Sequence, residues 1–567
     1  MRFFSLCLVL CVACGDDSSF LDAGTDARGP DAPELDATGP DAPGCGAEQT
    51  FEDVQVPMRD DAMLAAFIRR PTDPDCRLPT VLIQTPYNKE TARALWFEAD
   101  GPNPLFDSTD YAFVVVDWRG RFGSSDAESD PMLQDEDGYD TVEWIADQSW
   151  SDGTVGTFGP SALCRVQYRT AEAQPPALRA AVPIFCPRRE EYEQYYPGGV
   201  LRREYLQSLG LLFGTVTTLL EMHPTHDALW RSIENMTDPA ARIQVPMMLV
   251  AGWWDLSPAI QLADFAALRA RSPAGDDHRL LIGPWSHFAT NAESEGIGRD
   301  YTAEERMYFD NAQQMQIDTL AFFDLHLRGL ESAAATWPVV RWTTGASGVA
   351  ESGDVWPPTD TSAVEYYLGS GGTLDTGEPD GPPIDVDFPY DPADPSPTIG
   401  GMALRFDLLH GPTDQADVIA REDARTFETA PVSEPLRIRG RIVANLRVKT
   451  TGADTDFAVR IADIQPDGTW IWIGEGIRRL SLRDDFATRS EVVATTAYDV
   501  PVELANHLAY DLPVGHALGL IVTSSNFPRF DVNPNDGSDF LEAGGGMAVT
   551  NTVVTDGVSR LTIPLAP

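Results

Sequence analysis

The chain has 567 residues, of which 87 are acidic and 41 basic, and its formal net charge is −46. A chain this acidic lacks the basic surface that binds nucleic-acid phosphates or an anionic membrane, so we expect neither as an electrostatic partner. Hydrophobic residues make up 43% of the chain, which is typical of globular domains with a core and excludes a disordered protein.

The first residues are typical of an exported bacterial lipoprotein. Arg2 supplies a positive start, and the apolar run over residues 3–13, at about 11 residues, is too short to span a bilayer. Ala13 directly precedes Cys14, which predicts a signal peptide over residues 1–13 and lipidation of Cys14. The alternative is an ordinary secretory signal cut nearby. We expect a protein of the bacterial cell envelope, anchored by lipid at the outer membrane or in the periplasm, or a secreted one.

Residues 14–45 predict a disordered acidic tether. Asp, Ala, Gly and Pro dominate this segment, and almost nothing in it is apolar enough to be buried. The sequence Gly-Pro-Asp-Ala-Pro occurs at residues 29–33 and again at 39–43. The membrane contact that we expect is therefore the lipid on Cys14 alone.

Four cysteines remain beyond the predicted lipidation site. They are Cys45, Cys76, Cys164 and Cys186. An even number in an oxidising compartment favours disulfides, and four cysteines allow three pairings. The C-x-x-C pair of Cys11 and Cys14 straddles the expected cleavage site, so we expect no structural zinc.

Short apolar runs alternate with helical segments from about residue 60, which predicts βαβ units and a parallel sheet. Strands are expected at residues 80–84, 112–117, 155–158, 180–185, 247–251 and 279–282, with a helix at 139–148. Residues 187–240 change to helical runs, at 201–212 and 215–222, which predicts a helical cap. The α/β domain is then expected in two parts, over 46–186 and 241–334.

The pattern changes to a period of two over residues 335–567. Ala444, Leu446 and Val448 alternate with more polar neighbours, as in strands with one buried face. Turn residues such as Pro466-Asp467-Gly468 separate these runs. This pattern predicts an all-β sandwich of the jelly-roll type.

A candidate nucleophile lies between an expected strand and the helical stretch that follows it. Gly159-Pro160-Ser161-Ala162 comes directly after the strand at 155–158. A serine on a sharp strand-to-helix turn is the nucleophile elbow of an α/β-hydrolase. The backbone N–H of Ala162 would then point toward the oxygen of a bound substrate.

Two further polar residues follow later strands of the same expected sheet. Asp255 ends Gly252-Trp253-Trp254-Asp255, and His287 ends Gly283-Pro284-Trp285-Ser286-His287. Catalytic groups of open α/β sheets lie beyond the carboxyl ends of the strands, and the order Ser161, Asp255, His287 is the α/β-hydrolase order. The alternatives are a helix N-cap at Asp255 and a loop histidine at 287 that only makes hydrogen bonds.

Further motifs resemble the cocaine esterase-like family, which includes X-prolyl dipeptidyl aminopeptidases, α-amino acid ester hydrolases and cephalosporin acylases. The resemblance covers about residue 50 to the end of the chain. Its additional matching stretches are Thr85-Pro86-Tyr87, Asp117-Trp118-Arg119-Gly120, Asp137-Gly138-Tyr139-Asp140, Trp150-Ser151-Asp152-Gly153, Ser524-Ser525-Asn526-Phe527-Pro528-Arg529-Phe530 and Asn533-Pro534-Asn535. It implies an α/β-hydrolase domain followed by a C-terminal β domain, with Ser161, Asp255 and His287 as the catalytic triad.

The resemblance also implies an oxyanion hole made by the hydroxyl of Tyr87 and the amide of Ala162. A phenol aimed from a neighbouring loop can stabilise the negative charge that develops on a carbonyl oxygen. Without the resemblance, Tyr87 would be interpreted as a loop aromatic that packs on the edge of the sheet.

The elbow departs from the family pattern. Elbows of this family often have the sequence G-x-S-Y-x-G, whereas here Ala162 replaces the tyrosine and Cys164 the last glycine. A disulfide between Cys164 and Cys186 would explain the bulkier residue, and Cys45 would then pair with Cys76. The alternative for Cys164 and Cys186 is two buried thiols.

We therefore predict a serine hydrolase that cleaves a small-molecule ester or amide through an acyl-enzyme, without metal or cofactor. Trp253 and Trp254 are candidates for an apolar pocket lining, or alternatively for plain core. One alternative function is an X-Pro dipeptidyl aminopeptidase, or an acylase or ester hydrolase acting on α-amino acid derivatives. Another is a surface binding protein of weak activity that uses its jelly roll. The oligomeric state stays open.

Overall fold

The computed structural model describes residue 45 and residues 48–567, apart from 100–102, 215–217, 236–239, 288–310, 379–381, 541–544, 556 and 558. The predicted signal peptide, Cys14 and the tether up to residue 44 lie outside the described residues. The chain is divided into two compact units, and both units contain residues of α5 (Ala162–Ala173) and β6 (Leu178–Ile184).

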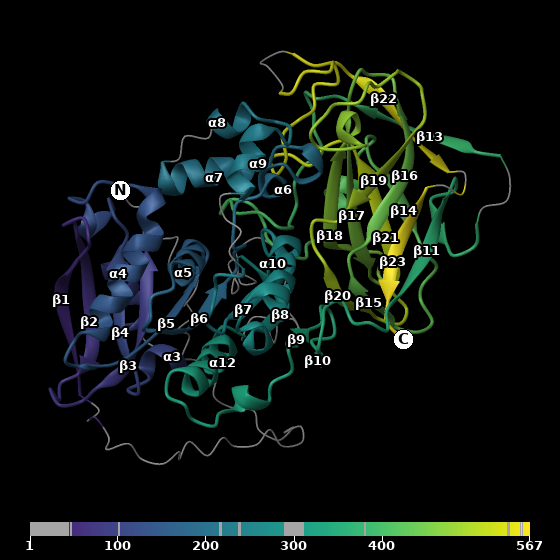
Figure 1. Cartoon of the computed structure of the whole chain (residues 1–567). Helices are drawn as coiled ribbons and strands as arrows, with labels where there is room; N and C mark the ends of the chain where they lie inside the picture. Colours follow the sequence, from purple (N-terminus) through teal and green to yellow (C-terminus); the bar gives the residue numbers. More distant parts are fainter. Residues whose placement is uncertain are drawn as a thin grey trace, which may run out of the picture. The chain divides into compact units, whose positions relative to one another are not determined.

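One unit, formed by the described residues within 1–159, 169–182 and 312–337, contains the first strands of a mixed sheet. These strands have the hydrogen-bonding order β1-β2-β4-β3-β5-β6 (Figure 1). The first two are antiparallel, whereas β3 is parallel to both β4 and β5. The further strands are β1 (Gln49–Pro57), β2 (Met63–Pro71), β3 (Leu78–Thr85), β4 (Ala112–Asp117) and β5 (Ser151–Pro160), and the helices are α2 (Lys89–Trp96), α3 (Pro104–Asp107), α4 (Gln134–Ala146) and α12 (Asn311–His326).

The parallel part of this sheet agrees with the sequence, and its edge does not. The continuous apolar run predicted as a strand over 112–117 is β4, and all of its residues are buried. The sequence analysis did not predict β1 and β2. Most residues of β1 are exposed or half-buried, as is expected at a sheet edge, so the strand lacks the continuous apolar run of a buried one.

The other unit, formed by the described residues within 160–168, 183–311 and 338–567, contains the remaining strands of the sheet. The end of β6 pairs with β7 (Met248–Trp254), and β7, β8 (Arg279–Ser286) and β9 (Val340–Thr343) run parallel in that order. β10 (Ala350–Gly353) closes this edge, antiparallel to β9. Helix α10 (Pro258–Arg271) follows β7 and packs against it.

β9 and β10 follow residue 335, where the β domain was expected to begin, and yet they pair with strands of the first sheet. Both strands belong to the first sheet, which extends to Gly353, and strands of the second sheet begin at Ser362. Each of the two strands is only four residues long. Over so short a segment, a half-buried strand of either sheet gives the same alternation, so the sequence pattern could not assign β9 to its parallel partner β8.

Helices occupy the segment for which a cap was predicted. They are α6 (Tyr192–Tyr195), α7 (Arg203–Phe213), α8 (Thr218–Glu221) and α9 (Ala228–Asn235). An aromatic cluster holds them together, in which the ring of Tyr192 stacks on Tyr196 at 5.2 Å and Trp230 is fully buried. Arg203 pairs with Asp531 of the β domain at 2.6 Å, so charges as well as rings fix this segment.

None of the described helices is long and apolar enough to cross a membrane.

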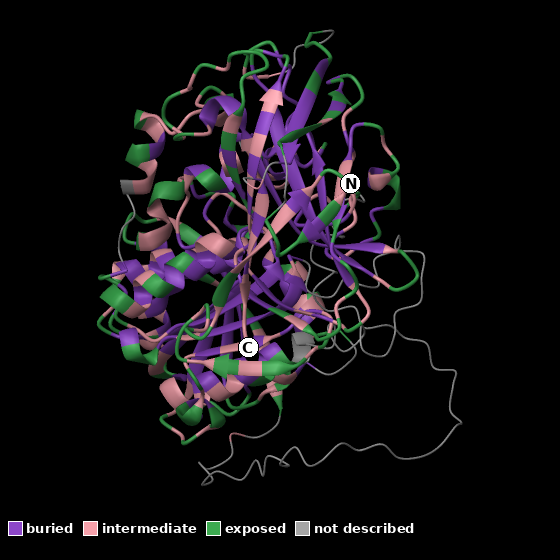
Figure 2. Ribbon diagram, turned by 90° about the vertical axis from the view of Figure 1, so that its right-hand side faces the viewer, coloured by how far each residue is buried: buried purple, intermediate pink, exposed green. Residues whose placement is uncertain are grey.

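The C-terminal β domain forms a second sheet of thirteen strands in the described part of the chain. They are β11 (Ser362–Gly369), β12 (Thr373–Asp375), β13 (Ile384–Tyr390), β14 (Arg425–Glu428), β15 (Leu436–Gly440), β16 (Val443–Thr450), β17 (Asp456–Ile464), β18 (Trp470–Arg479), β19 (Tyr498–Glu503), β20 (Leu508–Leu512), β21 (Ala517–Thr523), β22 (Val549–Thr555) and β23 (Arg560–Leu565), with a short helix α13 (Ala416–Ile419). The alternation predicted around Leu446 is confirmed, because β16 alternates buried and half-buried residues along its whole length. In Figure 2 much of the ribbon of the strands is coloured as buried.

Strand β17 differs from the expected pattern, because both of its faces are buried. It lies between β18 and β21, and its polar side chains have partners. Asp456 accepts a hydrogen bond from Arg479 at 2.9 Å, and Arg460 donates to the carbonyl of Pro397 at 2.8 Å. Buried charges are tolerated where they are paired, so these partners explain why a strand with charged residues lies inside the domain.

The disulfide between Cys45 and Cys76 joins the beginning of the described chain to the turn before β3. The two Cα atoms are 5.6 Å apart, and the sequence separation of the cysteines is 31. A bridge of this kind limits the freedom of the unfolded chain, so we expect it to stabilise the first unit.

Two buried histidines should make the protein sensitive to acid. Nδ1 of His278, which is fully buried, accepts the N–H of Met247 at 3.1 Å, and a protonated nitrogen cannot accept. Burial lowers the pKa of His278 from 6.5 to about 4, and it lowers the pKa of His410 to the same value. The unfolded chain therefore takes up protons that the folded chain does not, so stability is lost as the pH falls from 6.5 toward 4.

We expect His278→Asn to reduce this acid sensitivity, because the Asn oxygen can accept the N–H of Met247 and does not titrate. The difference in free energy of unfolding between neutral pH and about pH 5, measured with urea, should shrink by about 2 kcal/mol relative to the wild-type protein. An unchanged difference would contradict the assignment of His278 as a neutral buried residue.

Candidate active site

Ser161 occupies a strained turn between β5 and α5. Its φ of 58° lies in the left-handed region, which a residue with a side chain rarely adopts and which costs about 1–3 kcal/mol. The N–H of Ser161 donates to the carbonyl of Ile184 at 2.9 Å, and its own carbonyl accepts the N–H of Cys164 at 3.0 Å. The backbone therefore has the strand–turn–helix form of a nucleophile elbow.

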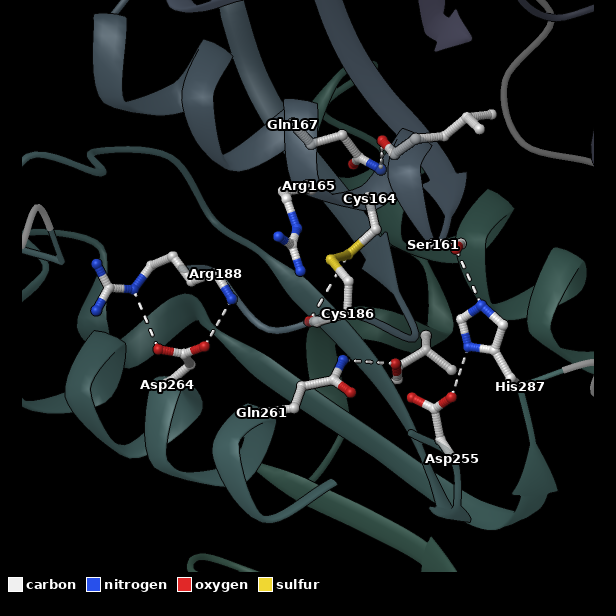
Figure 3. The surroundings of a disulfide bond; sticks show 12 residues. Ser161, Cys164, Arg165, Gln167, Cys186, Arg188, Asp255, Gln261, Asp264 and His287 are labelled. Atoms are coloured by element: carbon white, nitrogen blue, oxygen red, sulfur yellow. Dashed lines mark hydrogen bonds and ion pairs between the residues drawn. A yellow bond between two sulfur atoms is a disulfide. The ribbon is translucent and has the colours of Figure 1, made fainter. Parts of the chain in front are cut away.

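His287 lies between Ser161 and Asp255 (Figure 3). Its Nε2 is 2.9 Å from Oγ of Ser161, and its Nδ1 is 2.7 Å from Oδ1 of Asp255. A carboxylate can only accept, so Nδ1 carries the proton and Nε2 is the nitrogen that accepts from the serine hydroxyl. The residues that the sequence analysis selected, 126 and 32 residues apart in the chain, are thus within hydrogen-bonding distance.

Neighbouring parallel strands bring the acid and the histidine together. Asp255 follows β7 and His287 follows β8, and the register pairs Trp254 with Ser286 at the ends of these strands. Gly252 permits the close approach there, because a Cβ at this position would lie 2.2 Å from the carbonyl oxygen of Trp285. The pair is removed from water, with Asp255 only 1% and His287 only 9% exposed.

The second disulfide of the structure joins Cys164 to Cys186 beside this site (Figure 3). The Cα atoms are 6.1 Å apart, and both residues are buried. Of the two alternatives in the sequence analysis, the structure has the bridge and not the pair of thiols.

The two residues expected to form the oxyanion hole each lie shortly after the end of a strand. Ala162 is the first residue of α5, directly after Ser161. Tyr87 follows β3, is half-buried, and its N–H donates to Oγ1 of Thr85 at 3.0 Å. Ala162 and Ser161 belong to the second unit, and Tyr87 to the first.

Both tryptophans that were candidates for a pocket lining are buried. Trp253 is 1% exposed and donates its indole N–H to the carbonyl of Thr343 at 2.8 Å. Trp254 is 5% exposed and donates to the carbonyl of Ile473 at 3.2 Å. Their burial and hydrogen bonds favour the alternative that both are core residues.

The structure adds a residue that the sequence analysis did not find. Arg202 is 1% exposed, and its guanidinium donates to the carbonyl of Leu256, the residue after Asp255, at 3.1 Å. It also donates to the carbonyl of Gln194 at 3.3 Å. An arginine in a helical segment is usually exposed, so nothing in the sequence distinguished Arg202 from its neighbours.

The described residues contain no group of three or more His, Cys, Asp or Glu side chains that could hold a metal ion. The arrangement of Ser161, His287 and Asp255 supports nucleophilic chemistry with the protein's own groups. The imidazole can take the proton of the hydroxyl, and the buried carboxylate orients the ring and stabilises its charged form.

Comparison with known proteins shows the family of the chain. Residues 60–221 and 207–289 match the model of the X-Pro dipeptidyl-peptidase (S15) family, and residues 333–559 match that of the X-Pro dipeptidyl-peptidase C-terminal non-catalytic domain. The chain is 32% identical to cocaine esterase from a Rhodococcus species over 85% of this chain and 92% of that protein.

Two solved structures share the fold at lower identity. An aminopeptidase from the marine sediment archaeon Thaumarchaeota archaeon has a TM-score of 0.77 and 22% identity, and covers 96% of this chain and 99% of its own. An α-amino acid ester hydrolase has a TM-score of 0.73 and 23% identity, and covers 95% of this chain and 100% of its own.

The fold is that of an α/β-hydrolase domain with a C-terminal β domain, and the chain is a serine hydrolase. It belongs to the family that contains cocaine esterase and the X-Pro dipeptidyl-peptidases of family S15.

Proposed function

We propose that this serine hydrolase cleaves its substrate through a catalytic triad of Ser161, His287 and Asp255. The distances of 2.9 Å and 2.7 Å from His287 to its two partners are the observation that carries the proposal. His287 takes the proton of Ser161 as the serine oxygen attacks the carbonyl carbon, and Asp255 stabilises the imidazolium. The imidazolium then protonates the leaving group, which departs and leaves an acyl-enzyme. Water, deprotonated by His287, releases the acid.

The oxyanion hole in this proposal consists of the amide of Ala162 and the hydroxyl of Tyr87. The left-handed turn at Ser161 favours the amide, because the N–H after a nucleophile elbow points toward the reacting carbonyl. Tyr87 is supported by its place directly after β3 and by the family's pattern at Thr85-Pro86-Tyr87. Each donor stabilises the charge that develops on the substrate oxygen only in the transition state.

The substrate class that we propose is a small-molecule carboxylic ester. The similarity to cocaine esterase, which extends over 92% of that protein, supports an ester rather than a peptide. The second candidate is release of X-Pro dipeptides, which the match to the S15 family model favours. A peptidase of that type needs a carboxylate to hold the α-ammonium group of its substrate.

We propose that the enzyme is exported and anchored by lipid at Cys14. The support is the sequence alone: a positive residue, a short apolar run, and a small residue before the cysteine. The acidic segment that follows would then act as a spacer between the membrane and the enzyme.

Ser161→Ala should abolish turnover, with a loss on the order of 10⁶ in kcat, because no other group can form the acyl-enzyme. A fluorophosphonate probe should label the wild-type enzyme and not this variant. Ser125→Ala, which changes an exposed serine, is the control and should label like the wild type. Equal labelling of Ser161→Ala and wild type would refute the triad.

Tyr87→Phe should still be labelled by the probe, because Ser161 is unchanged. Its kcat, measured by turnover, should fall by about 10²–10³, because one donor of the oxyanion hole is lost.

A comparison of p-nitrophenyl acetate with Ala-Pro-p-nitroanilide should separate the two candidate functions. We expect kcat/KM for the ester to exceed that for the anilide by at least about a hundred-fold, because the anilide depends on recognition of its ammonium group. A preference for the anilide would instead identify a dipeptidyl-peptidase.

Expression of the full chain in a bacterium with a lipoprotein pathway should place the enzyme in the membrane fraction. Cys14→Ser removes the only group that can be lipidated at this position, so activity should move to the soluble fraction. Activity in the soluble fraction for both proteins would contradict the anchor and favour an ordinary signal peptide.

A further inference from the structure

The end of β6 is hydrogen-bonded both to the turn of Ser161 and to the strand that precedes Asp255. The segment over residues 184–188 contains the last residue of this strand and the four residues after it, among them Cys186 (Figure 3). The carbonyl of Ile184 accepts the N–H of Ser161 at 2.9 Å, and the N–H of Phe185 donates to the carbonyl of Val250 in β7, also at 2.9 Å. One short segment therefore contacts both the serine turn and the strand that leads to Asp255.

The same segment is fixed to helix α10, which begins shortly after Asp255. The N–H of Arg188 donates to Oδ2 of Asp264 at 2.6 Å, and its Nε lies 3.3 Å from Oδ1 of the same carboxylate. Both side chains are almost fully buried. Gln261, one turn earlier in α10, donates to the carbonyl of Val250 at 2.8 Å. The segment, β7 and α10 thus form one block on the Asp255 side of the site.

The disulfide is the covalent connection between this block and the helix of the nucleophile. Cys186 lies within the segment, and Cys164 lies in the first turn of α5, where its N–H donates to the carbonyl of Ser161. Cys164 is 0% and Cys186 5% exposed. Without the bridge, the hydrogen bond from Ser161 to Ile184 and the ion pair of Arg165 in α5 with Glu190 would still join α5 to the chain after β6. Both restrict sliding and rotation much less than a covalent bond does.

We propose that the Cys164–Cys186 disulfide positions the nucleophile, by holding the strained Ser161 turn at a fixed distance from His287 and Asp255. The inference rests on the proposed function, in which Ser161 attacks the substrate. The turn needs such support because its left-handed serine is unfavourable and can relax by moving the start of α5. A displacement of about 1 Å at a reacting atom is enough to cost a hundred-fold in rate.

A purely stabilising disulfide would have different consequences. Its removal would lower the stability of the protein, because the bridge closes a loop between cysteines 22 residues apart. The removal would leave the chemistry of the folded molecules unchanged. The two roles are separated by kinetic constants of the folded enzyme and not by stability.

The test is the double variant Cys164→Ala, Cys186→Ala in the full chain. We expect kcat for p-nitrophenyl acetate to fall by about ten- to a hundred-fold while KM changes by less than about two-fold, because the loss lies in the placement of the nucleophile. The rate constant of fluorophosphonate labelling should fall by the same factor. The endpoint of labelling counts the molecules that can react, so it corrects both constants for any unfolded protein.

The matched control is Cys45→Ala, Cys76→Ala, which removes the disulfide of the other unit. It should lower the thermal midpoint and leave kcat and the labelling rate constant unchanged. If the alanine pair at 164 and 186 does not fold, Cys164→Val with Cys186→Ala fills part of the volume of the lost sulfur atoms and replaces it in the test.

The outcomes distinguish this inference from the proposed function. A wild-type enzyme that does not label, or a Ser161→Ala variant that does, overturns the proposed function itself. Labelling at the wild-type rate constant by the 164/186 variant overturns only the positioning role. Equal losses of kcat in both disulfide variants overturn it too, because they would reflect general destabilisation.

Discussion

The left-handed turn at Ser161 is the constraint on which the site depends. A serine at φ 58° is less stable by about 1–3 kcal/mol than one in a common conformation, so the surrounding structure must hold it. A strand before it and a helix after it provide that hold, and the N–H of Ser161 is fixed by the carbonyl of Ile184. The hydroxyl then meets Nε2 of His287 at 2.9 Å, a distance that neither element could set alone.

Much of this site could be predicted from the sequence, because each of its three residues is recognised by the strand that directly precedes it. Ser161, Asp255 and His287 each follow an apolar strand, and the carboxyl ends of parallel strands share one edge of a sheet. Their convergence needs no long-range information beyond strand order. The sequence could not decide whether Cys164 and Cys186 form a disulfide or remain buried thiols, since both kinds of cysteine have the same neighbours in the chain.

The residues that the sequence did not reveal act through tertiary contacts. Nothing in the sequence around Arg202 distinguishes it from an exposed arginine of a helical segment. Only the fold places its guanidinium against the carbonyl of Leu256. The strands β9 and β10 were assigned to the β domain because four residues do not carry a distinguishable period. Both faces of β17 are buried because its charged side chains find partners, and partners are not visible in a pattern of polar and apolar letters.

The same buried arginine connects the C-terminal β domain with the loop that carries Asp255. Arg202 contacts the carbonyls of Leu256, beside Asp255, and of Met402, in the β domain, at 3.1 Å and 3.4 Å. Arg529 also donates to the carbonyl of Met402, and it pairs with Glu475 at 2.6 Å. A buried guanidinium is stable only while its acceptors stay in place, so loss of the β-domain carbonyl would leave Arg202, beside Asp255, with one acceptor fewer. The β domain therefore supplies a backbone acceptor to the same arginine that holds the residue after Asp255.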